Sequence, residues 1–212
     1  MSRKLLLIGG GGHFRSVLDT LKTLDIYDEL GVVDDPALIH EGCSVPVVGR
    51  DEDIPALFSN GWKEAFVTVG SVRATSKRRM LYEMVKKYGI VLPVIVDPSA
   101  VVSTEVVIGE GTYIGKGAIV NTGARIGTCA IINTGSIIEH DCKVGDFVHV
   151  GSGATLCGEV EIGDCSHLGA GSVVRQCVHI GSSVTIGLGS VVVKNIGDQR
   201  IAYGNPCKVV IR

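Results

Sequence analysis

The segment from Ile108 to Ile131 reads IGEGTY IGKGAI VNTGAR IGTCAI, and this pattern decides the fold of the chain. Each group of six begins with isoleucine or valine and carries a small or β-branched residue at its fifth position. The pattern extends in both directions without an insertion, so that sixteen consecutive hexads run from Val96 to Val191. A helix repeats every 3.6 residues and a strand every two, so neither produces a strict period of six. This period is typical of a hexapeptide β-helix.

The hexads predict a triangular solenoid in which three hexads form one coil of eighteen residues. Residues eighteen apart then stack at about one strand spacing, ~4.8 Å. The large aliphatic residue fills the interior, and the small residue fits where the chain turns back inward. A β-sandwich is the alternative, but its loops would vary in length and would interrupt the register.

An α/β domain is predicted before the solenoid. The apolar run Lys4–Ile8 ends in four glycines, and apolar residues at helical spacing follow over Phe14–Leu24. Strand, glycine turn and helix in this order open a Rossmann-like unit. Further strands are predicted at Leu30–Val33, Val45–Val48 and Ala65–Val69, and further helices at Ile54–Phe58 and from about Arg73 to Tyr88.

The last of these helices is expected to carry Lys77, Arg78 and Arg79 on its exposed side and to end at Gly89. We therefore divide the chain into a Rossmann-like domain over residues 1–95 and a β-helix over residues 96–195. Residues 196–212 form a tail that is expected to cover the last coil, because an open end of a β-helix must be covered.

The composition restricts the possible partners and the compartment. The formal net charge is −2, which gives no indication of binding to nucleic acid or to an anionic membrane surface. The first apolar run is too short for a signal peptide or a membrane span. Seven cysteines without a CxxC motif predict reduced thiols in a cytoplasmic protein.

The glycine turn predicts a ligand site at one edge of the α/β sheet. Backbone N–H groups in such a turn can approach phosphate or ribose oxygens, and the following helix N-terminus favours anions. The dinucleotide motif GxGxxG lacks its third glycine here, so we do not expect NAD. Nucleotide or sugar-nucleotide binding is predicted instead, with tight turns and a simple helix cap as the alternative. The strand ends at this edge carry Gly11, Gly12, His13, Asp34, Asp35 and Gly70.

A histidine segment stands out within the solenoid. His140 and Asp141 occupy the third and fourth positions of their hexad, which lie at a corner and point outward. Gly158 is eighteen residues later and is predicted to stack on His140. A histidine beside backbone that carries no side chain suits a general base next to an oxyanion donor. Asp141 or Glu139 is expected to orient its imidazole. Cys142 is expected to point into the core.

Other readings of the histidines remain open. Corner histidines on a solenoid can be ordinary surface residues, which is the interpretation we favour for His179. His149 and His167 are eighteen apart and stack, so a zinc lyase of the carbonic anhydrase type is an alternative, although the ligand set is incomplete and no metal is expected. A non-catalytic trimer that binds sugar nucleotides is a third possibility.

The chain resembles a known family over nearly its whole length. The features that carry the resemblance are the opening Gly-Gly-Gly-Gly-His, the hexads, the Glu-His-Asp-Cys segment at 139–142 and the Gly-Asn-Pro tail at 204–206. They are similar to those of bacterial sugar acetyltransferases that include UDP-4-amino-sugar N-acetyltransferases, perosamine N-acetyltransferases and sialic acid O-acetyltransferases. The resemblance implies a left-handed parallel β-helix after the Rossmann-like domain.

The resemblance also implies an activity, a donor and an assembly. Members transfer an acetyl group from acetyl-CoA to a sugar in surface-glycan biosynthesis, either to the amine of an amino-sugar nucleotide or, as the alternative, to a sialic acid hydroxyl. They are homotrimers, with acetyl-CoA in the groove between adjacent β-helices. His140 would be the base and Asp141 its acidic neighbour. His149, Ala170 and Leu188 would contact acetyl-CoA, although relatives have glycine where this chain has Leu188. The residues of the sheet edge would hold the sugar nucleotide.

Overall fold

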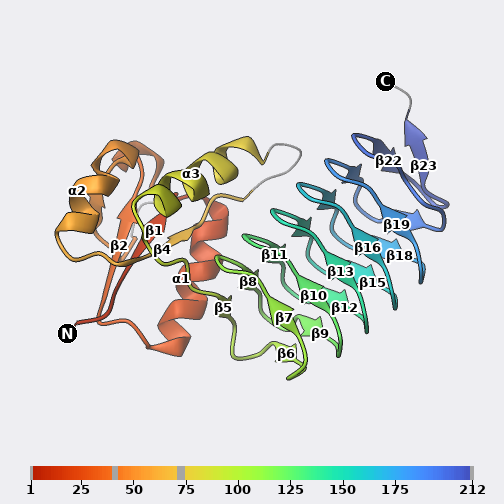
Figure 1. Ribbon diagram of the computed structural model, residues 1–212, viewed down its shortest axis with the longest axis horizontal. Helices are drawn as coiled ribbons and strands as arrows, with labels where there is room; N and C mark the ends of the chain where they lie inside the picture. The colour runs from red at the N-terminus through yellow and green to blue at the C-terminus, as the bar shows by residue number, and fades with distance from the viewer. Residues whose placement is uncertain (1, 40–42, 71–74, 211–212) are drawn as a thin grey trace. The chain divides into compact units, whose positions relative to one another are not determined.

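The chain forms two compact units, each described here by itself: the first contains the residues up to Gly70 and Ser76–Ile95, and the main part of the second begins at Val96. A computed structural model describes residues 2–39, 43–70 and 75–210 (Figure 1). Within these residues, no helix is long and apolar enough to cross a bilayer.

The first unit is a four-stranded parallel sheet with helices packed against it. The strands follow the order β3 (Val47–Gly49), β2 (Glu29–Val33), β1 (Lys4–Ile8) and β4 (Glu64–Val67). The central strand β1 reads KLLLI, and its four apolar residues are fully buried because helices cover both faces of such a sheet. The elements are β1 (Lys4–Ile8), α1 (Gly12–Leu24), β2 (Glu29–Val33), η1 (Pro36–Leu38), β3 (Val47–Gly49), η2 (Asp51–Asp53), α2 (Ile54–Ser59), β4 (Glu64–Val67) and α3 (Ser76–Lys87).

The predicted Rossmann-like order of elements is confirmed, and one prediction about a side chain is wrong. Lys77 and Arg79 are exposed as expected, but Arg78 is only 1% exposed. Arg78 shares a helical face with the buried residues Leu81 and Val85, because positions three and seven apart lie on one side of a helix. The predicted start of this helix at Arg73 lies outside the described residues.

The second unit is the predicted parallel β-helix, and it is left-handed. The strands of the hexads, from Ile95 to Val192, are two residues long and form three parallel sheets, with partners eighteen residues apart (Figure 1). The first sheet holds β6 (Val101–Val102), β9 (Ile119–Val120), β12 (Ile137–Ile138), β15 (Thr155–Leu156), β18 (Val173–Val174) and β21 (Val191–Val192). The second holds β7 (Val107–Ile108), β10 (Arg125–Ile126), β13 (Lys143–Val144), β16 (Glu161–Ile162) and β19 (His179–Ile180). The third holds β5 (Ile95–Val96), β8 (Tyr113–Ile114), β11 (Ile131–Ile132), β14 (His149–Val150), β17 (His167–Leu168), β20 (Thr185–Ile186), β22 (Ile201–Tyr203) and β23 (Lys208–Val210).

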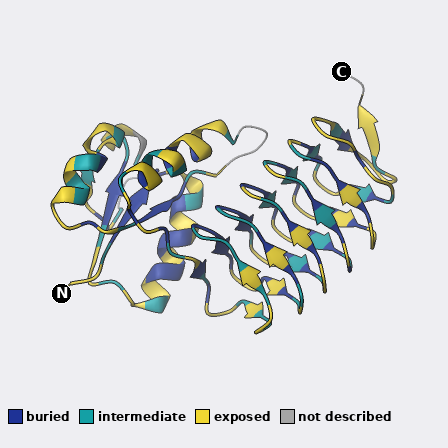
Figure 2. Ribbon diagram, in the orientation of Figure 1, coloured by how far each residue is buried: buried dark blue, intermediate teal, exposed yellow. Residues whose placement is uncertain are grey.

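The interior of the solenoid is filled as the hexads predict. Every first-position aliphatic residue from Ile114 to Ile186 is at most 3% exposed. The fifth-position serines Ser136, Ser166 and Ser190 are fully buried, and their hydroxyls donate to backbone carbonyls at the corners. Figure 2 shows buried residues on the inner side of each coil and exposed residues at the outer edges.

The fourth position of every hexad from Gly111 to Gly189 has a left-handed backbone, with φ between 50° and 71°. Seven of these positions are glycine, which adopts this conformation freely. Others are not, and Asp141 is among them with φ 58°. A side chain in this conformation costs about 1–2 kcal/mol, so it needs a compensating role.

The tail closes the end of the β-helix. β22 continues the third sheet parallel to β20, and β23 turns back antiparallel to β22. Ile196 and Ala202 are buried and join the core of the coils. The open end is thereby covered by chain from after the hexads.

Candidate active site

His140 and Asp141 meet at the corner between β12 and β13. The imidazole Nδ1 of His140 lies 3.0 Å from Oδ2 of Asp141, and about half of each side chain is exposed. The left-handed backbone of Asp141 turns its carboxylate back toward the ring of the preceding residue. We call this turn and its equivalents in the coils below and above, residues 121–123 and 157–159, the histidine corner.

The carboxylate makes the imidazole more basic. The pKa of His140 is raised above its usual value, first by the hydrogen bond with Asp141 and then by the negative charges of Asp141, Glu139 and Glu159. A carboxylate at Nδ1 fixes the proton on that nitrogen and leaves Nε2 to accept another. The pair is therefore built to take up a proton at Nε2.

Glu139 has a different partner. Its Oε2 accepts a hydrogen bond of 3.1 Å from Nδ2 of Asn121 and lies 3.4 Å from the backbone N of His140. Of the two carboxylates, Asp141 is the one that is hydrogen-bonded to the imidazole, and it is therefore the one we propose as the orienting group.

Gly158 packs against the imidazole from the next coil, as the period of eighteen predicts. A Cβ on Gly158 would lie 2.5 Å from Nε2 and 2.6 Å from Cε1 of His140. The carbonyl of Gly158 accepts from the N–H of Cys177. Among the hydrogen bonds of the described residues, none is donated by the Gly158 N–H. That N–H is therefore available to an oxygen atom bound beside His140.

Cys142 points into the core and is not placed for nucleophilic chemistry. Its side chain is fully buried, and its thiol donates to the carbonyl of Cys157 over 3.1 Å. Burial raises the pKa of this thiol to about 11. A thiol with such a pKa is protonated near neutral pH and is a poor nucleophile.

His149 lies on β14 in the third sheet rather than at the histidine corner. Its Nε2 is 3.2 Å from Nδ2 of Asn133, whose Oδ1 accepts from the N–H of Thr134. The amide nitrogen of Asn133 therefore faces the ring, so Nε2 of His149 accepts and Nδ1 carries the proton. Asn133 was not among the predicted site residues, because it is sixteen positions from His149 and off the stacking period.

The predicted stack of His149 on His167 is present, with ring centroids 4.9 Å apart. The described residues contain no group of three His, Cys, Asp or Glu side chains close enough to hold a metal ion. His140 lies at the histidine corner and not beside this pair, so it does not complete a zinc ligand set there.

Ala170 and Leu188 lie at a different corner, between the third and first sheets. They stack as predicted, with the N–H of Gly189 donating 2.8 Å to the carbonyl of Ala170. Leu188 is 82% exposed. In the described part of the chain, the N–H groups of Ala170 and Leu188 donate no hydrogen bond. We call residues 151–153, 169–171 and 187–189 the glycine corner, because glycines flank the middle residue in each turn.

The first unit brings the predicted strand-end residues to one edge of its sheet. Gly12 begins α1, and a Cβ on Gly70 would lie 3.4 Å from Cβ of His13. Gly11 and Gly12 face open space. The turn between β1 and α1 thus adjoins the end of β4.

The carboxylates of Asp34 and Asp35 accept hydrogen bonds from backbone N–H groups at this edge of the sheet. The carboxylate of Asp34 accepts from the N–H of Gly10 over 2.7 Å and from the N–H of Asp35 over 2.8 Å. The carboxylate of Asp35 accepts from the N–H of Ala37 and lies 3.5 Å from Arg50. Each carboxylate oxygen has a further lone pair, so a ligand hydroxyl can still bind.

Both units match known families. Residues 4–85 match the PglD N-terminal domain, and residues 141–176 match the bacterial transferase hexapeptide family. The chain is 34% identical to a mutant of perosamine N-acetyltransferase from Caulobacter crescentus, solved in complex with CoA and GDP-perosamine. That match covers 99% of this chain and 97% of the other, with a TM-score of 0.91. The chain belongs to the hexapeptide-repeat sugar acetyltransferase family.

Two further structures resemble this acetyltransferase. The acetyltransferase domain of PglB from Neisseria gonorrhoeae, in complex with acetyl coenzyme A, is 34% identical over 99% of this chain and 100% of the other, with a TM-score of 0.91. WeeI from Acinetobacter baumannii is 22% identical, with 99% and 100% coverage and a TM-score of 0.86, and supports the fold alone. Comparison with the curated proteins gave no significant match.

Proposed function

We propose that this acetyltransferase moves the acetyl group of acetyl-CoA to the amine of an amino-sugar nucleotide in surface-glycan biosynthesis. The observation that carries the proposal is the His140–Asp141 pair packed on the bare backbone of Gly158. The perosamine enzyme of Caulobacter crescentus supports it, since that relative was solved with CoA and GDP-perosamine. Seven free cysteines favour the reducing cytoplasm as the site of action.

The mechanism follows from these positions. The sugar amine attacks the thioester carbonyl of acetyl-CoA while Nε2 of His140 takes the amine proton. The Gly158 N–H donates to the oxyanion of the tetrahedral intermediate. When the intermediate collapses, the C–S bond breaks and the imidazolium returns its proton to the CoA thiolate. His149, Ala170 and Leu188 are proposed to contact acetyl-CoA, and Gly11, Gly12, His13, Asp34, Asp35 and Gly70 to bind the sugar nucleotide.

The acceptor is tested by measuring CoA release with a panel of GDP-perosamine, UDP-linked 4-amino sugars and sialic acid. An amino-sugar nucleotide is expected to support turnover, and mass spectrometry of the product should show one acetyl group on nitrogen. Turnover with sialic acid alone would replace the proposal by O-acetylation. Tight binding without CoA release from any acceptor would indicate a binding protein.

The pH profile should depend on Asp141. The wild-type kcat/KM is expected to rise with pH as His140 loses its proton, with its midpoint above the usual histidine pKa because Asp141 stabilises the imidazolium. Asp141→Asn removes that stabilisation, so the midpoint should move to lower pH while the plateau rate falls. Steady-state kinetics across the pH range measures both effects, and an unmoved midpoint would exclude Asp141 as the group that tunes the base.

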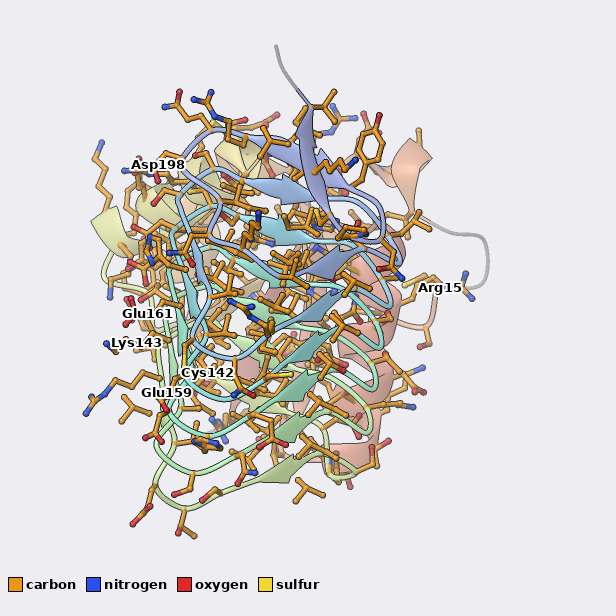
Figure 3. All side chains as sticks on the ribbon, turned by 90° about the vertical axis from the view of Figure 1, so that its right-hand side faces the viewer. Arg15, Cys142, Lys143, Glu159, Glu161 and Asp198 are labelled. Carbon is orange, nitrogen blue, oxygen red and sulfur yellow. The ribbon has the colours of Figure 1, made fainter. Side chains whose placement is uncertain are left out.

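A homotrimer would complete the site. The outward residues of the first sheet are mainly apolar, and Val101, Ile119 and Val173 are 64%, 39% and 39% exposed. By contrast, the outward side chains of the second sheet include the ion pair Lys143–Glu161, seen together at one side of the solenoid in Figure 3. An exposed apolar strip favours association, and the first sheet is therefore the proposed interface.

The assembly would bring two corners together. The histidine corner and the glycine corner flank the first sheet on opposite sides. In a closed threefold ring with the first sheets facing the axis, the histidine corner of one subunit adjoins the glycine corner of the next. The unpaired N–H groups of Ala170 and Leu188 would then face the same groove as His140, as an extended acyl-CoA requires.

Subunit mixing tests this shared site. His140→Ala and Leu188→Trp should each be inactive alone, because one lacks the base and the other blocks the groove. Co-expressed in equal amounts, the two variants should recover about one quarter of the wild-type activity, since a quarter of the interfaces then combine two intact corners. No recovery in mixed trimers, with trimers verified by light scattering, would place the whole site within one chain.

A further inference from the structure

We infer that Gly123 is a positioning residue for the His140–Asp141 pair, because the Asp141 carboxylate occupies the space that a side chain at Gly123 would fill. The inference rests on the proposed function of that pair and adds a residue from the coil below it. The pair is thus held between two glycines, with Gly123 beneath the carboxylate and Gly158 against the imidazole.

The contact at Gly123 is specific to the carboxylate. A Cβ built on Gly123 would overlap Oδ1 of Asp141 and would lie 3.3 Å from its Cγ and 3.6 Å from its backbone N. Oδ2 of the same carboxylate is the atom 3.0 Å from Nδ1 of His140. The two oxygens move together, so displacement of Oδ1 also displaces the oxygen that contacts the imidazole.

The backbone around Asp141 is held in place. Its N–H donates 3.0 Å to the carbonyl of Thr122, and the strands on both sides of the corner pair with the coils below and above. The end of a side chain moves more readily than such a backbone. A methyl group at Gly123 is therefore expected to rotate the carboxylate away from His140 and to leave the coil intact.

Because the backbone of Gly123 is left-handed, the test of Gly123→Ala needs a control variant that carries the same backbone strain. The φ of 71° at Gly123 is left-handed, so Gly123→Ala carries strain in addition to the overlap. Gly117 occupies the same hexad position one hexad earlier, with φ 62°, and a Cβ there would meet no atom within 4 Å. Gly117→Ala therefore reproduces the strain without the overlap, and it lies two coils before the residues of the glycine corner, in the same column of turns.

The first measurement is an NMR titration of His140 in the full-length variants. Asp141, Glu139 and Glu159 are the charged groups that act on this imidazole. The titration midpoint in Gly123→Ala should move down toward that of Asp141→Asn, whereas Gly117→Ala should match the wild type. The thermal midpoints of the two glycine variants should fall by similar amounts. A wild-type titration midpoint in Gly123→Ala would overturn the inference.

The second measurement is kcat/KM with acetyl-CoA and the acceptor identified by the panel. Gly123→Ala should lose about 10²-fold relative to Gly117→Ala, the usual effect of a misplaced catalytic group. Added to Asp141→Asn, the Gly123→Ala change should cost little more than Gly117→Ala does. A full additional loss in that background would show that Gly123 acts otherwise than through Asp141. Absence of acetyl transfer in the wild type would overturn the proposed function, while the titration would still decide the role of Gly123.

Discussion

Replacing His140 by alanine is expected to lower kcat/KM by about 10²–10⁴, the range for loss of a general base. The imidazole is half exposed and packs on Gly158 without filling the core, so the substitution should leave the fold unchanged. The pH profile of the residual activity should lack the rise that deprotonation of His140 causes, because no other group titrates in the place of His140. CoA release measured across pH with the acceptor from the panel checks both expectations.

His179→Ala is the matched control for His140→Ala. His179 is also an exposed solenoid histidine beside a carboxylate, with its Nδ1 3.5 Å from Glu161, but it lies in the second sheet and not at the histidine corner. Its removal should leave turnover within twofold or so of wild type, as for surface substitutions away from a site. Equal losses in both variants would mean that His140 is not the base.

Gly158→Ala is expected to lower kcat by about 10²–10³, the cost of disrupting an oxyanion donor. Two effects combine in this variant. The new Cβ would lie 2.5 Å from Nε2 of His140, so the imidazole must move, and the methyl group also narrows access to the Gly158 N–H. The left-handed region is not involved at Gly158, so backbone strain does not contribute.

A double variant separates the two effects. In His140→Ala the overlapping ring is gone, so adding Gly158→Ala should not lower the thermal midpoint further. Gln176→Ala, at the equivalent position one coil above, should have no effect on turnover and shows that the corner accepts alanine. A Gly158→Ala enzyme with wild-type kcat would remove Gly158 from the mechanism.

The period of six explains how much of the site the sequence predicts. A strict register places each residue relative to the one eighteen positions away, so Gly158 beside His140 and Leu188 beside Ala170 follow from counting. It also sends Cys142 inward, as the structure confirms. The same count backward from Asp141 leads to Gly123, but the period alone does not show that the Asp141 carboxylate fills the space beside that glycine.

Outside the hexad repeat, the sequence predicts fewer of the contacts between residues. Helical spacing does not by itself select which side of a helix is covered, so Arg78 was assigned to the exposed side although it is buried. The bracing of the glycine turn by Asp34 depends on the pairing of β1 with β2, which brings Gly10 within 2.7 Å of a residue 24 positions later. The contact of Asn133 with His149 depends on side-chain directions that no period describes.

The stacking of the coils determines which part of the proposed site is lost first when the β-helix partly unfolds. A solenoid is stabilised mainly by nearest-neighbour contacts, so it loosens from its ends rather than throughout. Gly123, His140 and Gly158 belong to three successive inner coils, whereas Leu188 belongs to the last full hexads before the tail. Partial fraying would therefore disturb the proposed acyl-donor contact at Leu188 while the His140–Asp141 pair stays assembled. Amide hydrogen exchange should accordingly be faster at Gly189, whose N–H donates to Ala170, than at Asp141, whose N–H donates to Thr122.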